Sequence, residues 1–423
     1  MASMRDVLRG NVLVLTMGTV IRALSLFVTF PYFSLYVIAL GGSKVDIGIV
    51  NSLRPLAAMF IYPVAGALTD SYSRVRILVA AGLVNALIMA VYMLAPDWRF
   101  LAAANFLNGL LVFRFPSESA LLADSMEPGL RGRGFAALTS IPTFVGILSP
   151  FMGGYLIEAL GVVLAMRILY GVTLVALALV AVMNWRFLDE TLPEPHSKRS
   201  DLPRIIGGAY RQVLETIRWL PRGLKFYALV IATTVFFNSI AGPYWVVYAT
   251  DVMGIREMDW GMILTIATIV QVALSFPAGG IIDRGDKRRV AAIALALSAL
   301  PVLAFPFSGG FIWALAAFVP IAVANAFLIP VAGALMADFV PPERRGMVMA
   351  TLGRGWLLVN FQGGVGGGAG MGFLLTLPVI IGSLIGGYIY EVNPTAPWLL
   401  LGAAMAGNAL IAGLLLRPGK DAS

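Results

Sequence analysis

The chain has 423 residues, of which 59% are hydrophobic and only 12% are charged, with 30 Lys and Arg against 22 Asp and Glu. A soluble domain carries about a quarter charged residues, so this composition excludes a water-soluble globule and indicates an integral membrane protein. There is no cysteine and one histidine, His196. A disulfide framework, a thiolate metal site and a histidine-cluster metal site are therefore excluded, and we expect no metal and no cofactor.

Long apolar runs dominate the chain. A helix needs about 20 mainly apolar residues to cross a bilayer, and backbone polar groups in lipid must be satisfied within the segment. The N-terminal MASMRDVLRG has no small-residue cleavage site before the first run, so we interpret that run as a span and not as a signal peptide. In chain order we predict helical spans at 11–40, 46–69, 75–96, 100–123, 135–160, 162–185, 226–250, 259–282, 289–307, 311–337, 371–390 and 396–416.

The spans divide into two sets of six, separated by a polar stretch. We predict an all-α membrane protein with an N-terminal six-helix bundle at 1–185, a linker at 186–225 and a C-terminal six-helix bundle at 226–423. The second part of the linker alternates apolar and basic positions with helical spacing. This pattern predicts either an amphipathic helix on the membrane surface or a solvated linker helix.

The basic residues sort by side of the membrane. If both termini are cytoplasmic, 23 of the 30 Lys and Arg residues fall on that face. This excess follows the positive-inside rule, so we expect both termini of a multi-pass plasma-membrane protein to be cytoplasmic. The excess of basic residues is then explained by the orientation of the chain in the membrane, and we expect no nucleic-acid partner. The other seven basic residues are Lys44, Arg99 and Arg256 outside, and Arg22, Arg54, Arg114 and Arg167 within spans.

The two halves repeat each other at an offset of 212 to 214 residues. Pro-Tyr and a later Tyr, Asp-x-Gly, Gly-x-x-x-Asp and an Ala-Leu-x-Ala-Asp segment all recur in order. Two similar six-helix halves with a site between them at the membrane midplane are typical of a transporter. GGYLIE (153–158) recurs as GGYIYE (386–391) at an offset of 233, so about 19 residues are inserted before the eleventh span. We place this Gly-rich insertion, 346–370, on the cytoplasmic side.

The loops after spans 2 and 8 carry related motifs, GALTDSYSRVR (66–76) and GGIIDRGDKRR (279–289). These resemble the loop motif of the major facilitator superfamily, although Ser71 and Ser73 depart from it. The resemblance covers nearly the whole chain. It implies a twelve-helix transporter of two pseudo-symmetric bundles that works by alternating access, usually as a monomer.

The same resemblance implies a gate at the cytoplasmic face. Asp70 at the end of span 2 is expected to meet the positive N-terminus of span 11, and Arg74 to pair with Asp124. The alternative is that these residues are ordinary loop charges. The predicted gating residues are Gly66, Asp70, Arg74, Asp124, Arg131, Gly279, Asp283, Arg284, Asp338 and Arg345.

Span 5 contains SPFMGG, which is similar to the Gly-Pro-x-x-Gly-Gly core of the antiporter motif of drug exporters. Pro150, Gly153 and Gly154 fit this core, whereas Ser149 replaces its first glycine. The resemblance implies drug and proton antiport. The alternative is that the small residues only allow close helix packing.

Two ionisable residues, Arg114 and Glu118, lie one helical turn apart inside span 4. Groups at this depth are functional candidates, and an i,i+4 pair can meet on one helix face. Three roles remain open. Glu118 is a proton carrier that pairs with Arg114 in one state, or Arg114 binds an anionic group, or the two form a fixed structural pair.

Further polar and aromatic residues inside the spans are candidates for substrate binding. With Arg114, the deep arginines outnumber the one deep acid, which favours an anionic or amphipathic substrate. Asn and Gln side chains have the alternative role of joining neighbouring helices. The candidates are Arg22, Tyr32, Tyr36, Arg54, Asn105, Asn108, Asn238, Tyr244, Trp245, Tyr248, Gln271 and Asn325.

The insertion contains GGVGGGAGMG (363–372). Its backbone N–H groups offer an anion cradle before span 11, or the run acts as a hinge beside the gate.

From these features we expect a proton-coupled secondary transporter that exports amphipathic or drug-like compounds, with protons and membrane lipid as its other partners. Uptake or exchange of organic anions through Arg22 and Arg114 is the alternative. A lipid flippase or scramblase, or a non-transporting sensor, on the same fold stays open. No nucleophile–base pair is visible in the sequence, so we do not expect an enzyme.

Overall fold

The computed structural model describes residues 7–192, 202–341, 344–353, 355, 357–363 and 371–416. Within these residues, twelve helices or pairs of consecutive helices are long and apolar enough to cross a membrane, which confirms the twelve predicted spans. The first six are α2 (Gly10–Thr29) with α3 (Phe33–Ala39), α4 (Lys44–Ser71), α5 (Arg74–Leu94), α6 (Trp98–Leu110) with α7 (Arg114–Asp124), α8 (Arg131–Val145) with α9 (Ser149–Leu160), and α10 (Val162–Phe187).

The second six spans follow a linker helix, α11 (Leu202–Trp219), which is the helix that the sequence predicted there. A short helix, α17 (Arg345–Leu352), precedes the eleventh span. The spans are α12 (Arg222–Ala241) with α13 (Trp245–Asp251), α14 (Glu257–Arg284), α15 (Lys287–Ala304), α16 (Gly310–Phe339), α18 (Phe373–Val392) and α19 (Ala396–Leu415).

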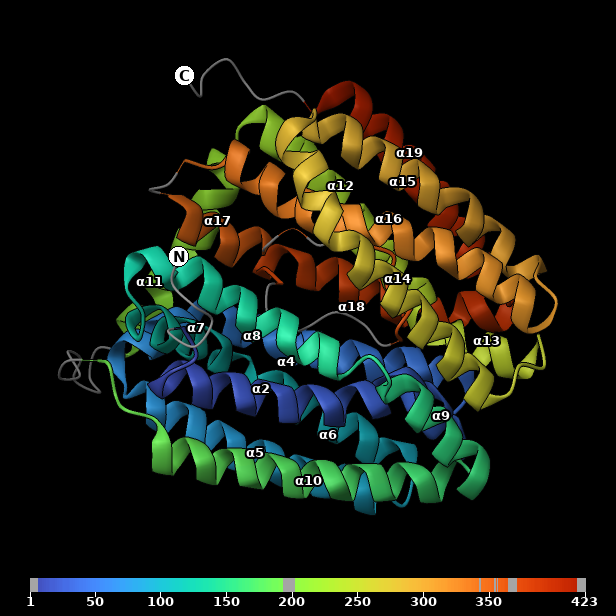
Figure 1. The fold of residues 1–423 in the computed structure, drawn as a ribbon, viewed down its shortest axis with the longest axis horizontal. Helices are drawn as coiled ribbons and strands as arrows, with labels where there is room; N and C mark the ends of the chain where they lie inside the picture. Colours follow the sequence, from blue (N-terminus) through green and yellow to red (C-terminus); the bar gives the residue numbers. More distant parts are fainter. Residues whose placement is uncertain are drawn as a thin grey trace.

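Two bundles lie side by side and meet most closely at one end. In Figure 1 the ribbons of the two halves converge at the end that carries α9 and α13, and they lie further apart at the end that carries α11 and α17. We name these the far end and the linker end. The halves contact each other through α4 against α18 and through α9 against α14.

Proline breaks the first and seventh spans at equivalent positions. Pro31 and Pro243 each lie in a short 3-10 turn that separates two helices, Phe30–Tyr32 in the first span and Gly242–Tyr244 in the seventh. Proline removes a backbone donor and clashes with the carbonyl four residues earlier, so the α-helix cannot continue unchanged through it. The repeat seen in the sequence is therefore a repeat of local structure.

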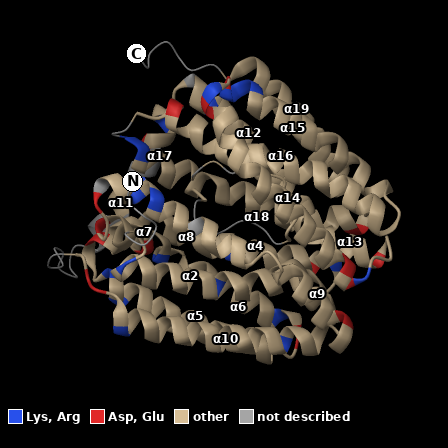
Figure 2. Cartoon of the chain, viewed as in Figure 1, with Lys and Arg blue, Asp and Glu red and all other residues tan. Residues whose placement is uncertain are grey.

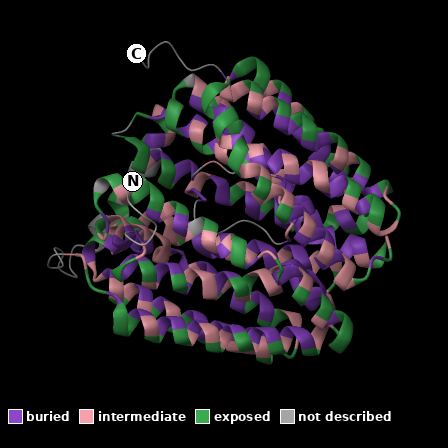
Figure 3. Ribbon diagram, in the orientation of Figure 1, coloured by how far each residue is buried: buried purple, intermediate pink, exposed green. Residues whose placement is uncertain are grey.

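Charge and burial fit a membrane setting. Lys, Arg, Asp and Glu gather mainly at the two ends of the molecule in Figure 2. Buried residues face the helix contacts in Figure 3, whereas the outward faces are exposed. Large apolar side chains such as Phe276 and Leu300 are among the exposed ones. A lipid-covered surface has this composition, because the hydrocarbon of the bilayer takes the place of water.

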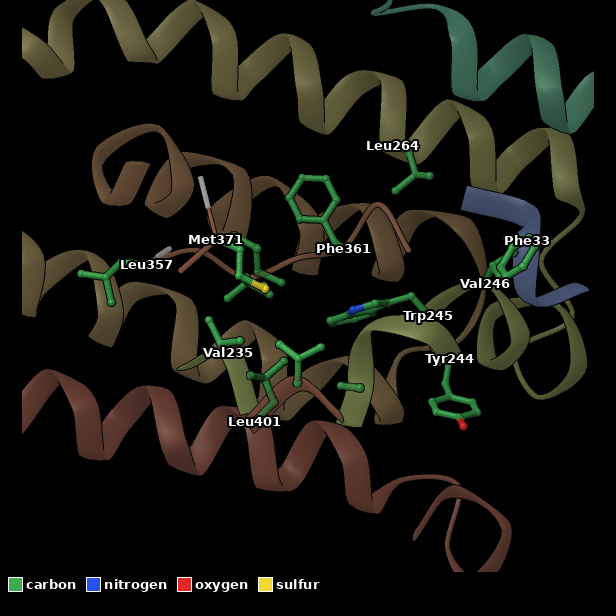
Figure 4. Packing of buried hydrophobic residues seen from close by; sticks show 14 of the residues in the cluster. Phe33, Val235, Tyr244, Trp245, Val246, Leu264, Leu357, Phe361, Met371 and Leu401 are labelled. Carbon is green, nitrogen blue, oxygen red and sulfur yellow. The ribbon is translucent and has the colours of Figure 1, made fainter. Parts of the chain in front are cut away.

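The sequence analysis placed the insertion before the eleventh span, 346–370, on the cytoplasmic side. Part of the insertion is the helix α17, and the described residues 357–363 enter the C-terminal half and hydrogen-bond to α12 and α16. Leu357, Phe361 and Met371 lie among the core side chains of that half in Figure 4, near Trp245. Most of the glycine run, 364–370, lies outside the described residues, so its role as an anion cradle or a hinge stays a prediction.

Candidate functional site

A buried ion pair joins the first and fourth spans. The Arg22 Nη2 of α2 donates to the Glu118 Oε1 of α7 over 2.5 Å, and the two side chains are 10% and 9% exposed. Arg22 also donates to the Thr19 hydroxyl at 2.8 Å, and that hydroxyl lies 3.2 Å from the same carboxylate oxygen. The two charges thus form a buried ion pair between different helices. Burying either charge without the other would cost several kcal/mol.

In this conformation the ion-pair partner of Glu118 is Arg22, and Arg114, the partner expected in one state, is not paired with it. Arg114 begins α7, and its guanidinium lies over the ring of its neighbour Phe115, 4.7 Å from the ring centre. The carboxylate of Glu118 instead faces α2, which packs against α7. The spacing of Arg114 and Glu118 permits a contact within the helix, but the neighbouring helix supplies the partner.

A small cavity with a mainly apolar lining lies inside the N-terminal half. It has a volume of about 60 Å³, and it includes three of the predicted candidates, Arg54, Asn105 and Asn108. Asn105 is committed to the structure, because it donates to the Val50 carbonyl at 2.6 Å and accepts from the Tyr92 hydroxyl at 3.2 Å. The Arg54 Nε is buried and has no hydrogen-bond partner among the described residues. Arg54 therefore keeps unused capacity to bind an anion.

The predicted tyrosines join helices instead of lining a cavity. Tyr36 and Tyr248 are buried, and their hydroxyls donate to backbone carbonyls within their own halves, at 2.9 and 2.7 Å. The Tyr32 hydroxyl donates to the Pro150 carbonyl of its own half at 2.6 Å and lies 3.3 Å from the Glu257 carbonyl of the other half. The Tyr244 hydroxyl donates across the halves to the Lys44 carbonyl at 3.0 Å. These contacts close the far end.

Small residues allow the same closure. A Cβ added at Gly48 would overlap the Ser383 carbonyl oxygen, and one at Gly261 would overlap that of Pro150. Gly154 meets α14 in the same way, so part of SPFMGG packs the two halves together. Helices approach this closely only where side chains are absent. Lys44 and Asp251 add an ion pair across the halves at this end.

The linker end carries ion pairs within each half. Arg74 pairs with Asp124 and also donates to the Thr191 hydroxyl at 3.0 Å. Lys287 pairs with Asp338 at 2.7 Å at the equivalent place in the other half. The contact between Arg74 and Asp124 is present as the resemblance implied, and its gating role stays a prediction.

Of the remaining predicted gating residues, Arg131 and Arg345 contact backbone carbonyls at equivalent positions of the two halves. Arg131 donates to the Ala123 carbonyl at 3.0 Å, and Arg345 approaches that of Ala337 at 3.4 Å. Asp70 is exposed and makes no ion pair among the described residues, so its predicted contact with span 11 is not made here. Gly66, Gly279, Asp283 and Arg284 are also at this end, and at Gly66 and Gly279 a Cβ would meet open space.

Three substrate-binding candidates of the C-terminal half use their side chains in contacts within the protein. Asn238 and Asn325 hydrogen-bond to the backbone of residues 358–360. Trp245 is fully buried against Phe305, Phe318 and Trp398, and its Nε1 has no hydrogen-bond partner among the described residues. The inserted segment thus takes up the hydrogen-bonding groups of the two asparagines, whereas the aromatic core of the C-terminal half encloses Trp245.

A second cavity lies between the halves. Its volume is about 190 Å³, and Gln271 of α14 is the one predicted candidate in its wall. The polar lining also includes Thr143, Thr268 and Gln362, and no charged side chain of the described part of the chain contributes. Among the described residues no cluster of three or more metal-ligand side chains occurs.

Sequence reasoning missed several of these residues. Thr19 lies one turn before Arg22 and was recognisable from that spacing. Lys287 was part of the second loop motif, and its match to Arg74 follows from the repeat. Gln362 gave no signal, because nothing in the sequence placed the insertion inside the bundle.

Comparison with known proteins agrees with this architecture. The profile of the Major Facilitator Superfamily matches residues 15–237 and 227–423, so the chain belongs to that superfamily and is a multi-pass membrane transporter. The crystal structure of the human organic anion transporter MFSD10 (TETRAN) is similar with a TM-score of 0.65 at 16% identity, over 95% of this chain and 98% of that one. The nucleoside transporter NupG gives 0.64 at 13% identity, over 96% and 98%. These two likenesses show the fold alone.

Two relatives are named as drug-resistance proteins. The multi-drug resistance efflux pump PmrA of Streptococcus pneumoniae is 23% identical over 199 residues, which is 46% of this chain and 49% of PmrA. This chain therefore matches about half the length of that relative. The multidrug resistance protein MdtG of Yersinia enterocolitica is 24% identical over 308 residues, 71% of each chain.

Proposed function

We propose that this protein is a proton-coupled secondary transporter that exports amphipathic, drug-like compounds. The observation that carries the proposal is the buried pair of Arg22 and Glu118, which joins two spans in the interior of the N-terminal half. Ionisable groups inside a membrane protein are costly and mark ion or substrate pathways. The names of PmrA and MdtG support the class of compound.

Glu118 carries the proton in this mechanism. When its carboxylate is charged, it holds Arg22 and lies beside Thr19. Protonation removes the charge that pairs with Arg22, and a buried cation without a partner is strongly destabilising. Arg22 then moves toward solvent or substrate, and α2 shifts against α7. The return of Arg22 expels the proton, which links proton release to the arrangement of the two spans.

The linker end faces the cytoplasm in this proposal, because 23 of 30 Lys and Arg residues lie there under the predicted topology. With the far end closed by tyrosine and glycine contacts, the conformation takes up solute from the cytoplasm. The protein works in the plasma membrane, and as a monomer.

Flux in proteoliposomes tests the proposal. Wild type and Glu118→Gln are compared under an imposed pH gradient with a panel of amphipathic cations, anions and neutral compounds. Glu215→Gln, on the exposed face of α11, makes the same chemical change as a control. We expect gradient-driven flux that Glu118→Gln lowers at least about tenfold and the control leaves unchanged. Absence of flux for every compound contradicts transport, and equal flux in Glu118→Gln contradicts the role of Glu118.

Organic-anion transport is the second candidate. Arg54 supports it, because this residue lines the cavity of the N-terminal half and its buried Nε has no hydrogen-bond partner among the described residues. The organic anion transporter MFSD10 shares the fold. Loss of anion flux, with cation flux retained, in Arg54→Gln distinguishes this candidate from drug export.

A further inference from the structure

The inserted segment 357–363 forms neither helix nor strand, and the burial of its residues alternates along the chain. Leu357, Val359 and Phe361 are 1%, 0% and 3% exposed, whereas the residues between them are only half-buried. An extended chain presents alternate side chains to opposite faces. The buried residues therefore pack into the C-terminal half, where Phe361 lies 5.3 Å from Phe318 between ring centres, and the residues between them form a less buried face.

Two buried asparagines hold the backbone of the segment. Asn238 donates to the Leu358 carbonyl at 2.8 Å and accepts from the Asn360 N–H at 2.7 Å. Asn325 donates to the Val359 carbonyl and accepts from the N–H of the same residue, both at 2.9 Å. An amide offers both a donor and an acceptor, so these side chains satisfy buried backbone groups as a neighbouring strand would. The segment is thus a built part of the bundle interior.

The segment ends against the other half of the molecule. Gly363 has a φ of +88°, and an added Cβ would lie 3.2 Å from the Phe30 carbonyl oxygen and from the Pro31 Cα. Both the backbone conformation and the close approach require glycine. The preceding residue, Gln362, is thereby set at the boundary between the halves.

Gln362 belongs to the wall of the cavity between the halves. Its Nε2 lies 3.3 Å from the Thr268 hydroxyl, and Gln271 and Thr143 complete the polar lining. The apolar lining comes from Phe27, Phe30 and Ile147, together with two prolines. Among the described residues no charged side chain lines the cavity, so an ion placed there would lose water without gaining a counter-charge, whereas a neutral polar group finds partners.

We propose that the inserted segment forms the C-terminal wall of a substrate subsite, in which Gln362 hydrogen-bonds an uncharged amide, carbonyl or hydroxyl group carried on an apolar ring or chain. This inference rests on the proposed transport function and specifies the part of the substrate that faces the C-terminal half. The charged residues Arg22, Arg54 and Glu118 lie in the N-terminal half, so the two halves of the pathway recognise different chemistry.

The placement of the segment is tested by cysteine labelling, since the chain has no cysteine of its own. Gln362→Cys lines the cavity between the halves and Leu358→Cys is on the same half-buried face of the segment, whereas Val359→Cys and Phe361→Cys face the core. With a water-soluble maleimide on protein in nanodiscs, we expect the first pair to react at least about tenfold faster than the second, because reaction requires exposure of the thiol. Equal rates in the two pairs overturn the placement. Thermal unfolding identifies any variant that fails to fold, and the other member of its pair then decides.

The chemistry of the subsite is tested by protection of Thr143→Cys, a cavity position in the N-terminal half. The probes are N-benzylacetamide, benzyltrimethylammonium and phenylacetate, which are of similar size and differ in charge. We expect the neutral amide to protect best, and Gln362→Leu to raise its half-protecting concentration about five- to tenfold, as the loss of one hydrogen bond does. Better protection by a charged probe, or no change in Gln362→Leu, overturns the proposal. Since this assay measures binding, its outcome is independent of whether gradient-driven flux occurs.

Discussion

Tyr32 and Tyr244 are 212 positions apart in the chain, and each extends its hydroxyl across the interface to a backbone carbonyl at the start of a helix in the other half. Tyr32 lies 3.3 Å from the Glu257 carbonyl of α14, and Tyr244 donates to the Lys44 carbonyl of α4 at 3.0 Å. The repeated Pro-Tyr of the sequence is thus a repeated contact. Both tyrosines stabilise the closed far end.

Removing the Tyr244 hydroxyl weakens this closure. One hydrogen bond contributes about 0.5–1.5 kcal/mol, so we expect Tyr244→Phe to raise the population of the far-end-open state about two- to tenfold. The measurement is the labelling rate of Thr143→Cys by an impermeant maleimide added from the far end. Tyr248→Phe is the control, since its hydroxyl donates to Pro306 within the same half. A similar rise in both variants contradicts a specific role of Tyr244.

Glycine to alanine changes at the interface act more strongly. We expect Gly48→Ala and Gly261→Ala to prevent far-end closure, because the new Cβ overlaps a backbone carbonyl of the opposite half. Transport then falls at least about tenfold, since alternating access needs both states. Gly280→Ala, where a Cβ meets open space, serves as the control in the same flux assay. Retained flux in both interface variants would show that the far end opens and closes by another contact.

The Arg22–Glu118 pair can be examined through stability. We expect Arg22→Ala to destabilise the protein by about 3 kcal/mol or more, because it leaves the Glu118 charge buried alone. The double replacement Arg22→Met with Glu118→Met removes both charges and is expected to recover most of the loss. Chemical denaturation of all the variants in detergent provides the comparison. A double variant no more stable than the single one contradicts direct pairing.

Glu190 gives a pH-dependent prediction outside the membrane. Partial burial works to raise the pKa of its carboxyl, but hydrogen bonds from the Ser73 hydroxyl and from the N–H groups of Leu192, Val75 and Thr191 outweigh burial and lower that pKa. Because the pKa of Glu190 is lower in the folded protein than in the unfolded chain, its charge stabilises the folded state when the pH is above the unfolded pKa of about 4.3. This stabilisation is lost as the pH falls through the pKa of the folded protein.

Wild type is therefore expected to unfold at a higher temperature than Glu190→Gln at pH 7, and the difference is expected to shrink below about pH 4.3. Its size stays under about 1 kcal/mol, because the group is largely exposed. Thermal unfolding of both proteins from pH 7 to pH 3.5 measures it. A difference that grows on acidification contradicts the assignment.

The sequence predicted the architecture well because its signals are long. Twenty-residue apolar runs and a constant offset between halves do not depend on side-chain contacts, and the twelve spans appear close to the predicted bounds. The pairing of Arg74 with Asp124 came from the resemblance, and the structure contains that contact.

Side-chain partners across helices were less predictable. The i,i+4 rule pointed from Glu118 to Arg114, but it is a rule about one helix, and the packing of α2 against α7 brought Arg22 closer. Likewise, Asn238 and Asn325 looked free to bind a substrate until the insertion was seen to occupy both amides. A segment that enters a bundle from outside the spans leaves no periodic signal in the chain.

The most direct test of the central claim compares uphill transport with exchange. A proton carrier is needed to accumulate substrate under a pH gradient, but exchange of labelled for unlabelled substrate across a liposome without a gradient needs only alternating access. We expect Glu118→Gln to lose accumulation while it retains exchange at a rate near that of wild type. Accumulation retained in Glu118→Gln, or exchange and accumulation lost together in a stably folded variant, would contradict the assignment of Glu118 as the proton carrier.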